Sequence, residues 1–356
     1  MNKEIKIGKR LIGLDYPTYF VADIAANHDG NLERAKDLIY LCADAGADAA
    51  KFQNFKAETI VSQYGFSNIG QQVSHQSQWS KSVFDVYNEA SLPMKWTQTL
   101  KETCQDAGID YLTAPYDLSI IEELSKYVCA WKLGSGDITW HENIKAMANT
   151  DKPLLIATGA SDMSEVRMAV DVASKNTKDL VLMQCNTNYT ASVENFNHIA
   201  LNVLKTYTKE FPDIVLGLSD HTPGHTTVLG AVVLGARVIE KHFTDNCNNN
   251  GPDHKFSMDP TSWAEMVYAT RELEAALGTE EKRVMDNEVE TVIIQRRGIR
   301  ATRKLKAGEI IRDKDLTHLR PCTEDCLPPY RSDELIGKIL TSNLEEGECI
   351  KLKDIN

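Results

Sequence analysis

The chain contains no run of about 18 consecutive apolar residues, the length that a membrane-spanning helix requires. Its first residues, MNKEIKIGKRLIG, contain no apolar core of roughly 7–15 residues and therefore lack the character of a signal peptide. Acidic residues are in excess, and the formal net charge of −12 argues against binding to nucleic acid or to an anionic membrane. We therefore expect a cytoplasmic protein that binds neither nucleic acid nor membranes, although a local lysine cluster could still bind a small anion.

Closely spaced cysteine pairs are also nearly absent. Cys322 and Cys326 are close in the sequence, but no second pair completes the ligand set of a structural zinc site. Scattered cysteines of a cytoplasmic protein are normally reduced. We therefore expect all eight to be structural thiols: Cys42, Cys104, Cys129, Cys185, Cys247, Cys322, Cys326 and Cys349.

Short apolar runs recur along the first 280 residues and alternate with segments of helical pattern. Continuous apolar runs of this length suit strands that are buried on both faces, as in a parallel sheet. The eight runs are 19–26, 47–53, 109–115, 129–135, 153–159, 180–186, 214–220 and 237–243. They predict an α/β fold, a (β/α)8 TIM barrel over residues 1–280. A doubly wound sheet is the weaker alternative, because it would need a glycine-rich turn after the first strand, and the sequence has none there.

The pattern changes near residue 290. Residues 281–294 are the expected linker, and residues 295–356 contain short apolar runs broken by Gly, Asp and Lys, which predict a small module of short strands. Within the barrel, the segment 54–93 is rich in Ser, Gln and Asn and is too long for an ordinary connection between a strand and a helix. Loops of that length are usually functional or disordered.

Two histidines follow neighbouring predicted strands of the barrel, at the end where active sites of this fold lie. His221 ends the seventh strand and His242 ends the eighth, each beside a carboxylate, Asp220 or Glu240. Two imidazoles at this place can meet at one divalent metal, and the two carboxylates could then orient them. The alternative is a buried polar network that closes the top of the barrel.

Two lysines, Lys51 and Lys132, lie on the second and fourth predicted strands, near enough to face one ligand. Lysines on barrel strands either form Schiff bases or bind anions. Hydroxyl groups at Thr113, Ser135 and Ser219 favour a phosphate-binding site. The alternative is a pair of salt bridges from the lysines to Asp23 and Asp137.

The motifs together resemble those of one enzyme family. NHDG, KFQ, KLGSGDI, GLSDHT, IEKHFT and GPDHKFSMDP occur in this order at the ends of the predicted strands. They are similar to the motifs of bacterial sialic acid (nonulosonate) synthases, which use phosphoenolpyruvate and carry a C-terminal antifreeze-like (SAF) module. LRPC and LIGKIL resemble the pattern of that module, so the likeness extends over nearly the whole chain.

The resemblance implies roles for individual residues. Family histidines at His221 and His242 hold a divalent metal, usually manganese, with magnesium and cobalt as alternatives. An arginine at the position of Arg320 reaches the sugar from the partner subunit, which implies a domain-swapped homodimer. The alternative for Arg320 is a surface arginine paired with Asp315 or Glu324. The expected substrate contacts are Lys51, Gln53, Thr113, Lys132, Ser135, Asn186, Thr187, Tyr189, Ser219, Asp253 and Arg320.

The sequence also departs from the family pattern. Asp23 stands where the family usually has Glu, and Ala114 and Ala157 replace hydroxyl-bearing residues close to the expected phosphate. Asn186 and Thr113 are candidates to compensate for the lost hydrogen bonds. The departures leave the identity of the sugar open between N-acetylmannosamine and a diacetamido-trideoxy hexose.

The implied reaction condenses phosphoenolpyruvate with an open-chain N-acylated mannosamine-type sugar and water. The products are a nonulosonic acid of the sialic or legionaminic type and phosphate. Asp23 and Asp137 are the candidate carboxylates for positioning or proton transfer. One alternative is a pyruvate-dependent aldolase with a Schiff base on Lys51, Lys132 or Lys241. The other is a sugar-binding protein without catalytic activity.

Overall fold

The computed structural model of the protein describes residues 3–69, 76 and 79–356. The chain divides into two compact units, Met1–Gly278 and Thr279–Asn356, and each is considered by itself. None of the helices in the described ranges is both long and apolar enough to cross a membrane.

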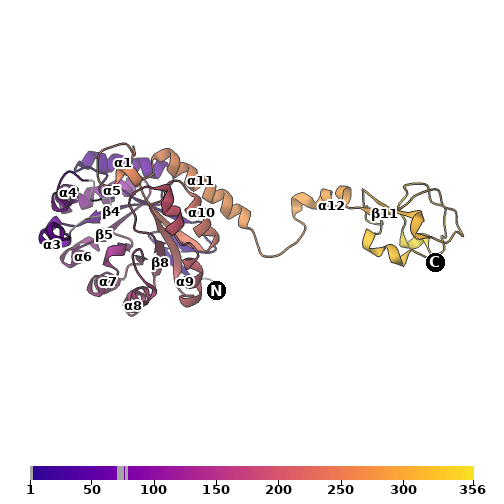
Figure 1. The fold of residues 1–356 in the computed structure, drawn as a ribbon, viewed down its shortest axis with the longest axis horizontal. Coiled ribbons are helices and arrows are strands. Elements are labelled where there is room, and N and C mark those ends of the chain that lie inside the picture. Colours follow the sequence, from indigo (N-terminus) through magenta and orange to yellow (C-terminus); the bar gives the residue numbers. More distant parts are fainter. Residues whose placement is uncertain (1–2, 70–75, 77–78) are drawn as a thin grey trace. The chain divides into compact units, whose positions relative to one another are not determined.

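The first unit is built on eight parallel strands that close into a barrel in the order β10-β3-β4-β5-β6-β7-β8-β9 (Figure 1). The predicted (β/α)8 barrel is thereby confirmed. Most of its strands are shorter than the apolar runs that predicted them. They are β3 (Tyr19–Asp23), β4 (Ala49–Asn54), β5 (Asp110–Pro115), β6 (Trp131–Leu133), β7 (Leu154–Ala157), β8 (Leu180–Cys185), β9 (Val215–Asp220) and β10 (Ala236–His242).

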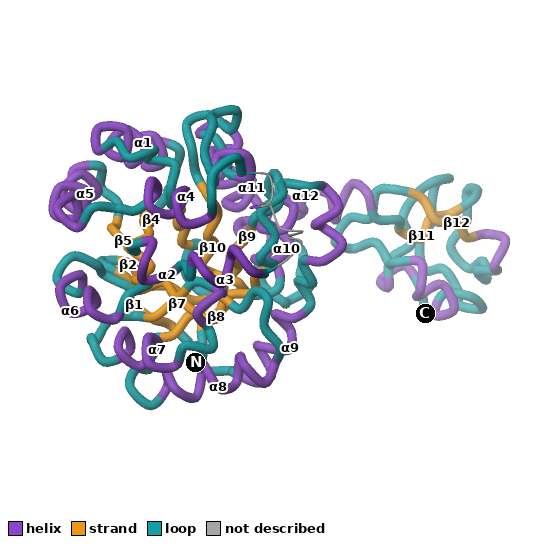
Figure 2. The backbone as a smooth tube through the Cα atoms, turned by 60° about the vertical axis from the view of Figure 1, so that its left-hand side comes forward, coloured by secondary structure: helices purple, strands orange, loops and turns teal. Residues whose placement is uncertain are grey.

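A ring of helices surrounds the strands, as the tube of Figure 2 shows. Local sequence starts several of them: the Asn31 side chain accepts hydrogen bonds from the first turn of α1, and Asp162 and Glu165 form a capping box at α8. The helices are α1 (Leu32–Asp44), α5 (Thr97–Asp106), α6 (Ile121–Leu124), α7 (His141–Ala148), α8 (Met163–Ser174), α9 (Val203–Glu210), α10 (Thr226–Val233) and α11 (Pro260–Leu277).

An antiparallel hairpin for which the sequence pattern gives no clear sign closes the barrel at its N-terminal end. It consists of β1 (Glu4–Ile7) and β2 (Arg10–Gly13). Ile5, Ile7 and Ile12 of this hairpin are at most 3% exposed and pack with inward-facing strand residues such as Val21 and Leu112. The opposite end, where the strands terminate, is left as the mouth of the barrel.

The long segment after β4 forms three short helices, α2 (Ala57–Ile60), α3 (Gln63–Asn68) and α4 (Val83–Ala90). The expectation that 54–93 is an unusual functional or disordered loop concerns in part residues 70–75 and 77–78, which lie outside the described residues. Its described part contributes to the wall of a cavity at the mouth.

The second unit has its own small core, which includes Ile299, Leu305, Leu335, Leu344 and Ile350. It contains α12 (Val289–Gln295) and the antiparallel strands β11 (Gly298–Ala301) and β12 (Leu316–Leu319), which confirms the expected module of short strands. The segment expected as a linker, 281–294, contains most of α12.

One disulfide in this unit corrects the expectation that every cysteine is reduced. Cys326 and Cys349 are paired, with their Cα atoms 5.6 Å apart, whereas Cys322 remains a thiol. The two partners are separated by 23 residues and meet only because the module folds its last residues back beside β11. Spacing in the sequence gives no sign of this.

Candidate active site at the barrel mouth

Four charged side chains from strands β3, β4, β6 and β10 meet inside the barrel. Lys51 Nζ lies 2.7 Å from Asp23 Oδ2 and 3.6 Å from Glu240 Oε2, and Lys132 Nζ lies 3.2 Å from Glu240 Oε1. All four side chains belong to residues that are at most 4% exposed. Two ammonium groups and two carboxylates leave this buried layer without net formal charge, which is what makes its burial tolerable.

The structure contains one of the two salt bridges that the sequence offers as the alternative role of the lysines. The salt bridge between Lys51 and Asp23 that the sequence left as an alternative is present, but the carboxylate partner of Lys132 among the described residues is Glu240, not Asp137. Burial alone would raise the pKa of Glu240, yet Lys132 and Lys51 hold that pKa below its usual value. Glu240 is therefore an anion shared by both lysines.

His221 and His242 lie side by side at the ends of β9 and β10, with ring centroids 5.4 Å apart. His221 Nδ1 is 3.0 Å from the main-chain oxygen of Asn186, and His242 Nε2 is 3.4 Å from Asp23 Oδ2. His242 Nδ1 is buried and has no hydrogen-bond partner among the described residues. Burial, followed by the charge of His221, holds the pKa of His242 well below its usual value, so this imidazole is neutral.

The prediction that Asp220 and Glu240 orient the two histidines is wrong. Asp220 binds Lys241 and accepts hydrogen bonds of 2.8 Å from the hydroxyls of Thr222 and Thr227, while Glu240 binds the two lysines. The reason is the alternation of side chains along β10, where Glu240 and His242 face inward and Lys241 faces the helix layer. The two adjacent imidazoles still suit a divalent metal that accepts nitrogen ligands.

The ends of β6, β7 and β8 converge on a small cradle of hydroxyl and amide groups. Gly159 N donates a 2.9 Å hydrogen bond to Ser135 Oγ. A Cβ atom at Gly159 would collide with Thr187 Oγ1 and lie 3.0 Å from Cys185 Sγ, so the approach requires glycine. Ser219 completes this side by donating a 3.0 Å hydrogen bond to Glu240 Oε1.

Thr113 is the predicted substrate contact that the structure does not bring to the mouth. Its hydroxyl donates to Asn54 Oδ1 at 2.6 Å and lies 3.1 Å from Phe52 O, and the residue is completely buried. Thr113 is paired with Phe52, whose ring packs in the layer between the strands and the helices. Its neighbour Ala114 takes the inward-facing position instead.

A cavity of about 300 Å³ opens above the charged layer. Its polar lining includes Gln53, Ser135, Asp137, Thr187, Tyr189, His242 and Asp253, and its apolar lining includes Phe55, Ile60, Val86 and Ala90. Burial raises the pKa of Asp137 to about 6 and that of Asp253 to about 6. Two carboxyl groups that titrate near neutral pH in one cavity are typical of a catalytic site.

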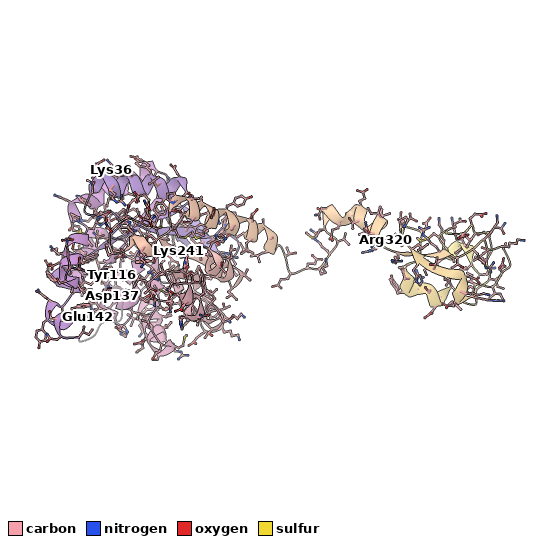
Figure 3. The ribbon with its side chains drawn as sticks, turned by 45° about the horizontal axis from the view of Figure 1, so that its top comes forward. Lys36, Tyr116, Asp137, Glu142, Lys241 and Arg320 are labelled. Atoms are coloured by element: carbon pink, nitrogen blue, oxygen red, sulfur yellow. A yellow bond between two sulfur atoms is a disulfide. The ribbon has the colours of Figure 1, made fainter. Side chains whose placement is uncertain are left out.

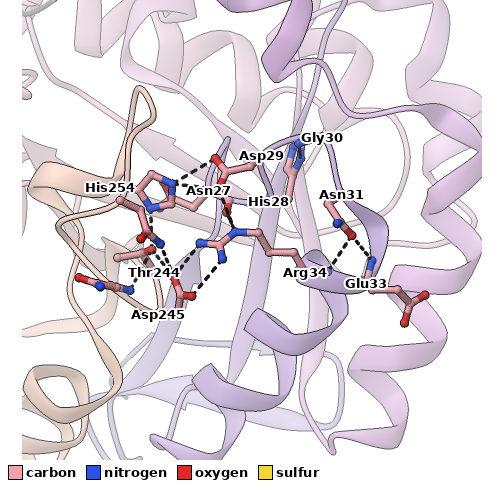
Figure 4. Close-up of polar contacts among 12 residues, drawn as sticks. Asn27, His28, Asp29, Gly30, Asn31, Glu33, Arg34, Thr244, Asp245 and His254 are labelled. Carbon is pink, nitrogen blue, oxygen red and sulfur yellow. Dashed lines mark hydrogen bonds and ion pairs between the residues drawn. The ribbon is translucent and has the colours of Figure 1, made fainter.

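A polar network fixes the loop that carries Asp253, as the close-up in Figure 4 shows. Arg34 of α1 binds Asp245 through two hydrogen bonds of 2.6 and 3.0 Å, and its Nε lies 2.9 Å from Asp29 Oδ2. The buried His254 ring is held between Asp29 Oδ1 at 3.1 Å and Thr244 Oγ1 at 2.7 Å. The loops after the first and last barrel strands are thereby joined beside the cavity.

Two aromatic residues at the mouth of the barrel were not singled out from the sequence. Phe256 packs on His242 with ring centroids 4.8 Å apart and on Tyr189 at 5.2 Å. Tyr116 and Asp137, both labelled in Figure 3, line the same cavity, and the charge of Asp137 raises the pKa of Tyr116. Tyr116 follows Pro115 at the end of β5, where the sequence reads as the start of a loop, so only its place just after a strand end could have indicated it.

The remaining predicted contacts are divided between the two units. Asn186 contributes its main-chain oxygen to His221, while its side chain donates a 3.3 Å hydrogen bond to His198 O. Arg320 follows β12 in the second unit and is exposed. Asp315, one of the partners considered for it, instead binds Arg303 at 3.0 Å.

Comparison with known proteins identifies what this architecture belongs to. The family model described as the NeuB family matches residues 38–282, and the model of the SAF domain matches residues 296–356. The N,N'-diacetyllegionaminic acid synthase of Legionella pneumophila is 35% identical over 355 residues, covering 98% of this chain and 97% of its own. The human N-acetylneuraminate-9-phosphate synthase is 27% identical over 342 residues, covering 96% of this chain and 93% of its own.

A solved structure supports the same assignment. The N-acetylneuraminic acid synthetase of Leptospira borgpetersenii aligns with a TM-score of 0.71 and 27% sequence identity, over 82% of this chain and 96% of that one. The relatives named here are sugar acid synthases, and the matched ranges cover both the barrel and the C-terminal module. The chain belongs to the NeuB family and ends in a SAF domain.

Proposed function

We propose that the protein condenses phosphoenolpyruvate with an open-chain N-acylated mannosamine-type sugar and water, giving a nonulosonic acid of the sialic or legionaminic type and inorganic phosphate. The observation that carries the proposal is the order of the polar groups along the barrel axis. Lys51 and Lys132 lie in the buried charged layer, and a cavity of about 300 Å³ with the carboxyl groups of Asp137 and Asp253 opens above it. This order suits phosphoenolpyruvate bound at the lysines and an uncharged sugar bound in the cavity.

The lysines are the proposed ligands of phosphoenolpyruvate. An ammonium group has three N–H donors. Lys132 directs donors to Glu240 and to the main-chain oxygen of Leu133 at 3.0 Å, and Lys51 directs one to Asp23, so each retains capacity for a further anion. Two hydroxyl groups lie near the lysines: Ser219 is hydrogen-bonded to Glu240, and Ser135 lines the cavity. In a buried site such contacts are stronger than in water.

The condensation forms a bond between C3 of phosphoenolpyruvate and the aldehyde carbon of the sugar. Water then adds at C2, one proton goes to the former aldehyde oxygen, and the C–O bond to phosphate breaks to leave a 2-keto acid. His221 and His242 are the proposed holders of a divalent metal, manganese in the first instance, which when bound supplies Lewis-acid activation of the aldehyde oxygen. Asp137, with its pKa of about 6, is suited to move a proton near neutral pH, and Asp23 to orient the reacting groups.

The Schiff-base alternative is disfavoured by the state of the lysines. Burial lowers the pKa of Lys51, but Asp23 and Glu240 more than compensate, so the amine is a cation and not a nucleophile. Lys241 points away from the cavity and is bound to Asp220. Borohydride trapping with pyruvate would label a lysine if this alternative were correct.

The deciding experiment is a phosphate-release assay. The protein is incubated with phosphoenolpyruvate, manganese and a panel of sugars that includes N-acetylmannosamine, 2,4-diacetamido-2,4,6-trideoxymannose and unacylated mannose. We expect phosphate and a 2-keto acid in equal amounts with at least one N-acylated sugar. If no sugar of the panel gives phosphate, the proposal is refuted, and a sugar-binding protein without catalytic activity is favoured.

We also propose that the active form is a homodimer in which Arg320 of one chain serves the barrel of the other. Its support is the resemblance at LRPC and the exposure of Arg320 on the second unit. Solution scattering and sedimentation of the full chain test the dimer, and mixing of Arg320→Ala with His242→Ala chains tests the exchange.

A further inference from the structure

Tyr116 is a polar cavity residue to which neither the motifs nor the proposed reaction gives a role. It follows β5 directly, and its ring packs edge-on against Phe55 with centroids 6.2 Å apart. Its main-chain N–H donates a 3.0 Å hydrogen bond to Asn54 O, which fixes the residue to the end of the neighbouring strand. The side chain is therefore held in place by both its backbone and its ring.

The hydroxyl of Tyr116 points at the loop that carries Ser135 and Asp137. A Cβ atom at Gly134 would lie 2.7 Å from the phenolic oxygen, so the absence of a side chain at Gly134 makes room for it. Within the described part of the chain, the hydroxyl has no hydrogen-bond partner. Tyr116 is half-buried and lines the cavity, so its hydroxyl can bind water or a ligand there.

The surroundings indicate what the hydroxyl can bind. Lys51 and Lys132 are 2% exposed and are absent from the cavity lining, so the anionic substrate has its proposed site below. Apolar side chains of Phe55, Ile60 and Val86 line the same cavity. Burial raises the pKa of Tyr116 well above its usual value, with the charge of Asp137 as the next cause, so the phenol stays protonated and acts as a donor. One donor beside an apolar wall matches an acyl group, which has a carbonyl oxygen next to a methyl group.

We propose that the Tyr116 hydroxyl donates a hydrogen bond to the carbonyl oxygen of an N-acyl group of the sugar, whose methyl group packs against Phe55 and its neighbours. This inference rests on the proposed function and adds to it a residue that selects acylated sugars. Tyr116 binds the substrate and takes no part in proton transfer.

The test compares wild type with Tyr116→Phe, which removes one oxygen atom and keeps the ring. Tyr111→Phe is the matched control, because the Tyr111 ring likewise contacts a phenylalanine, Phe52, but is buried between the strands and the helices, outside the cavity. For the best N-acylated sugar of the panel, loss of one neutral hydrogen bond should lower kcat/KM about five- to tenfold in Tyr116→Phe. The KM for phosphoenolpyruvate should stay within about twofold of wild type.

Selectivity provides a readout that a purely structural role would not change. The ratio of kcat/KM for the N-acylated sugar to that for its counterpart with a hydroxyl in place of the acylamino group should fall about five- to tenfold in Tyr116→Phe and remain unchanged in Tyr111→Phe. The inference would be overturned if this selectivity ratio did not change in Tyr116→Phe, or if the KM for sugar and the KM for phosphoenolpyruvate rose together. If wild type turns over no sugar, the proposed function fails as well; if wild type is active and Tyr116→Phe equals it, only this inference fails.

Discussion

Lys51 Nζ lies 2.7 Å from Asp23 Oδ2, and the two side chains are 3% and 2% exposed. They come from paired positions of the neighbouring strands β4 and β3. The carboxylate also lies 3.4 Å from His242 Nε2 and accepts a 3.3 Å hydrogen bond from Gln53 Nε2. Asp23 therefore connects the proposed anion site, the histidine pair and the cavity.

Replacing Asp23 should destabilise the barrel. Asp23→Asn would leave Lys51 with Glu240, 3.6 Å away, as its carboxylate partner. Breaking a buried ion pair costs on the order of 3 kcal/mol, whereas Asp23→Glu keeps the charge and should cost less than half of that. Urea unfolding followed by tryptophan fluorescence measures this, because all five tryptophans lie in the first unit. Equal stability of wild type and Asp23→Asn would contradict the importance of the pair.

Replacing the lysines should weaken the binding of phosphoenolpyruvate. For Lys51→Met and Lys132→Met we expect a loss on the order of 2–4 kcal/mol each, measured by calorimetric titration, because these contacts are charge-assisted and buried. Lys241→Met is the matched control: Lys241 is 1% exposed and bound to Asp220, but faces the helix layer. It should lose stability and keep its affinity. Wild-type affinity in both Lys51→Met and Lys132→Met would make these two lysines structural.

How far the sequence could lead is visible in these lysines and their neighbours. The barrel was predictable because strands that are buried on both faces form continuous apolar runs, and their polar ends indicated the mouth. The same burial on both faces removes the alternation that would tell which residues face inward. Thr113 was therefore expected in the cavity although Ala114 has the inward position, and Asp220 was expected beside His221 although it binds Lys241.

Other features depended on contacts between distant residues. The hairpin β1–β2 was missed because its apolar residues are few and alternate with charged ones, and it becomes recognisable only when Ile5 and Ile7 fill the bottom of the barrel. The role of Glu240 as partner of both lysines needed three strands in register. Tyr116 lies in a segment that reads as a loop, and only the glycine at position 134 explains its position.

The histidine pair should bind manganese in the absence of substrate. We expect His221→Ala and His242→Ala to lose the calorimetric signal of manganese binding, and to lose the rise in Tm that bound metal gives wild type. His225→Ala is the control, because His225 lies just before α10 and is not part of the pair. Full turnover in the presence of a chelator would rule out the metal assignment, as would retained manganese binding in both variants.

Asp137 and Asp253 should make stability depend on pH. Burial raises the pKa of each to about 6, so the folded chain holds their protons more tightly than the unfolded chain does. Their contribution to the free energy of unfolding is complete below about pH 4 and is lost as pH rises through about 6. Between pH 4 and pH 8, the free energy of unfolding measured with urea should therefore fall less steeply in Asp137→Asn and Asp253→Asn than in wild type.

The exposed Asp179→Asn should reproduce the wild-type pH profile and thus serves as the control. A profile that is equally steep in all three variants would mean that neither carboxyl group is perturbed.

Exchange of Arg320 between subunits can be tested by mixing two chains that are each impaired. Arg320→Ala should bind phosphoenolpyruvate normally but have a raised KM for sugar, because a guanidinium donates to sugar oxygens without losing its proton. Arg331→Ala is the control, since Arg331 is already engaged with Glu334 through hydrogen bonds of 2.6 and 2.8 Å in the same module.

When Arg320→Ala and His242→Ala chains are refolded together, a mixed dimer combines an intact barrel of the first with an intact Arg320 of the second. Random pairing makes half of the dimers mixed, each with one complete site of two. At a sugar concentration far below the KM of Arg320→Ala, an equal mixture should therefore recover about one quarter of wild-type activity. If mixed dimers form, as native mass spectrometry would establish, and activity does not return, Arg320 acts within its own chain or not at all.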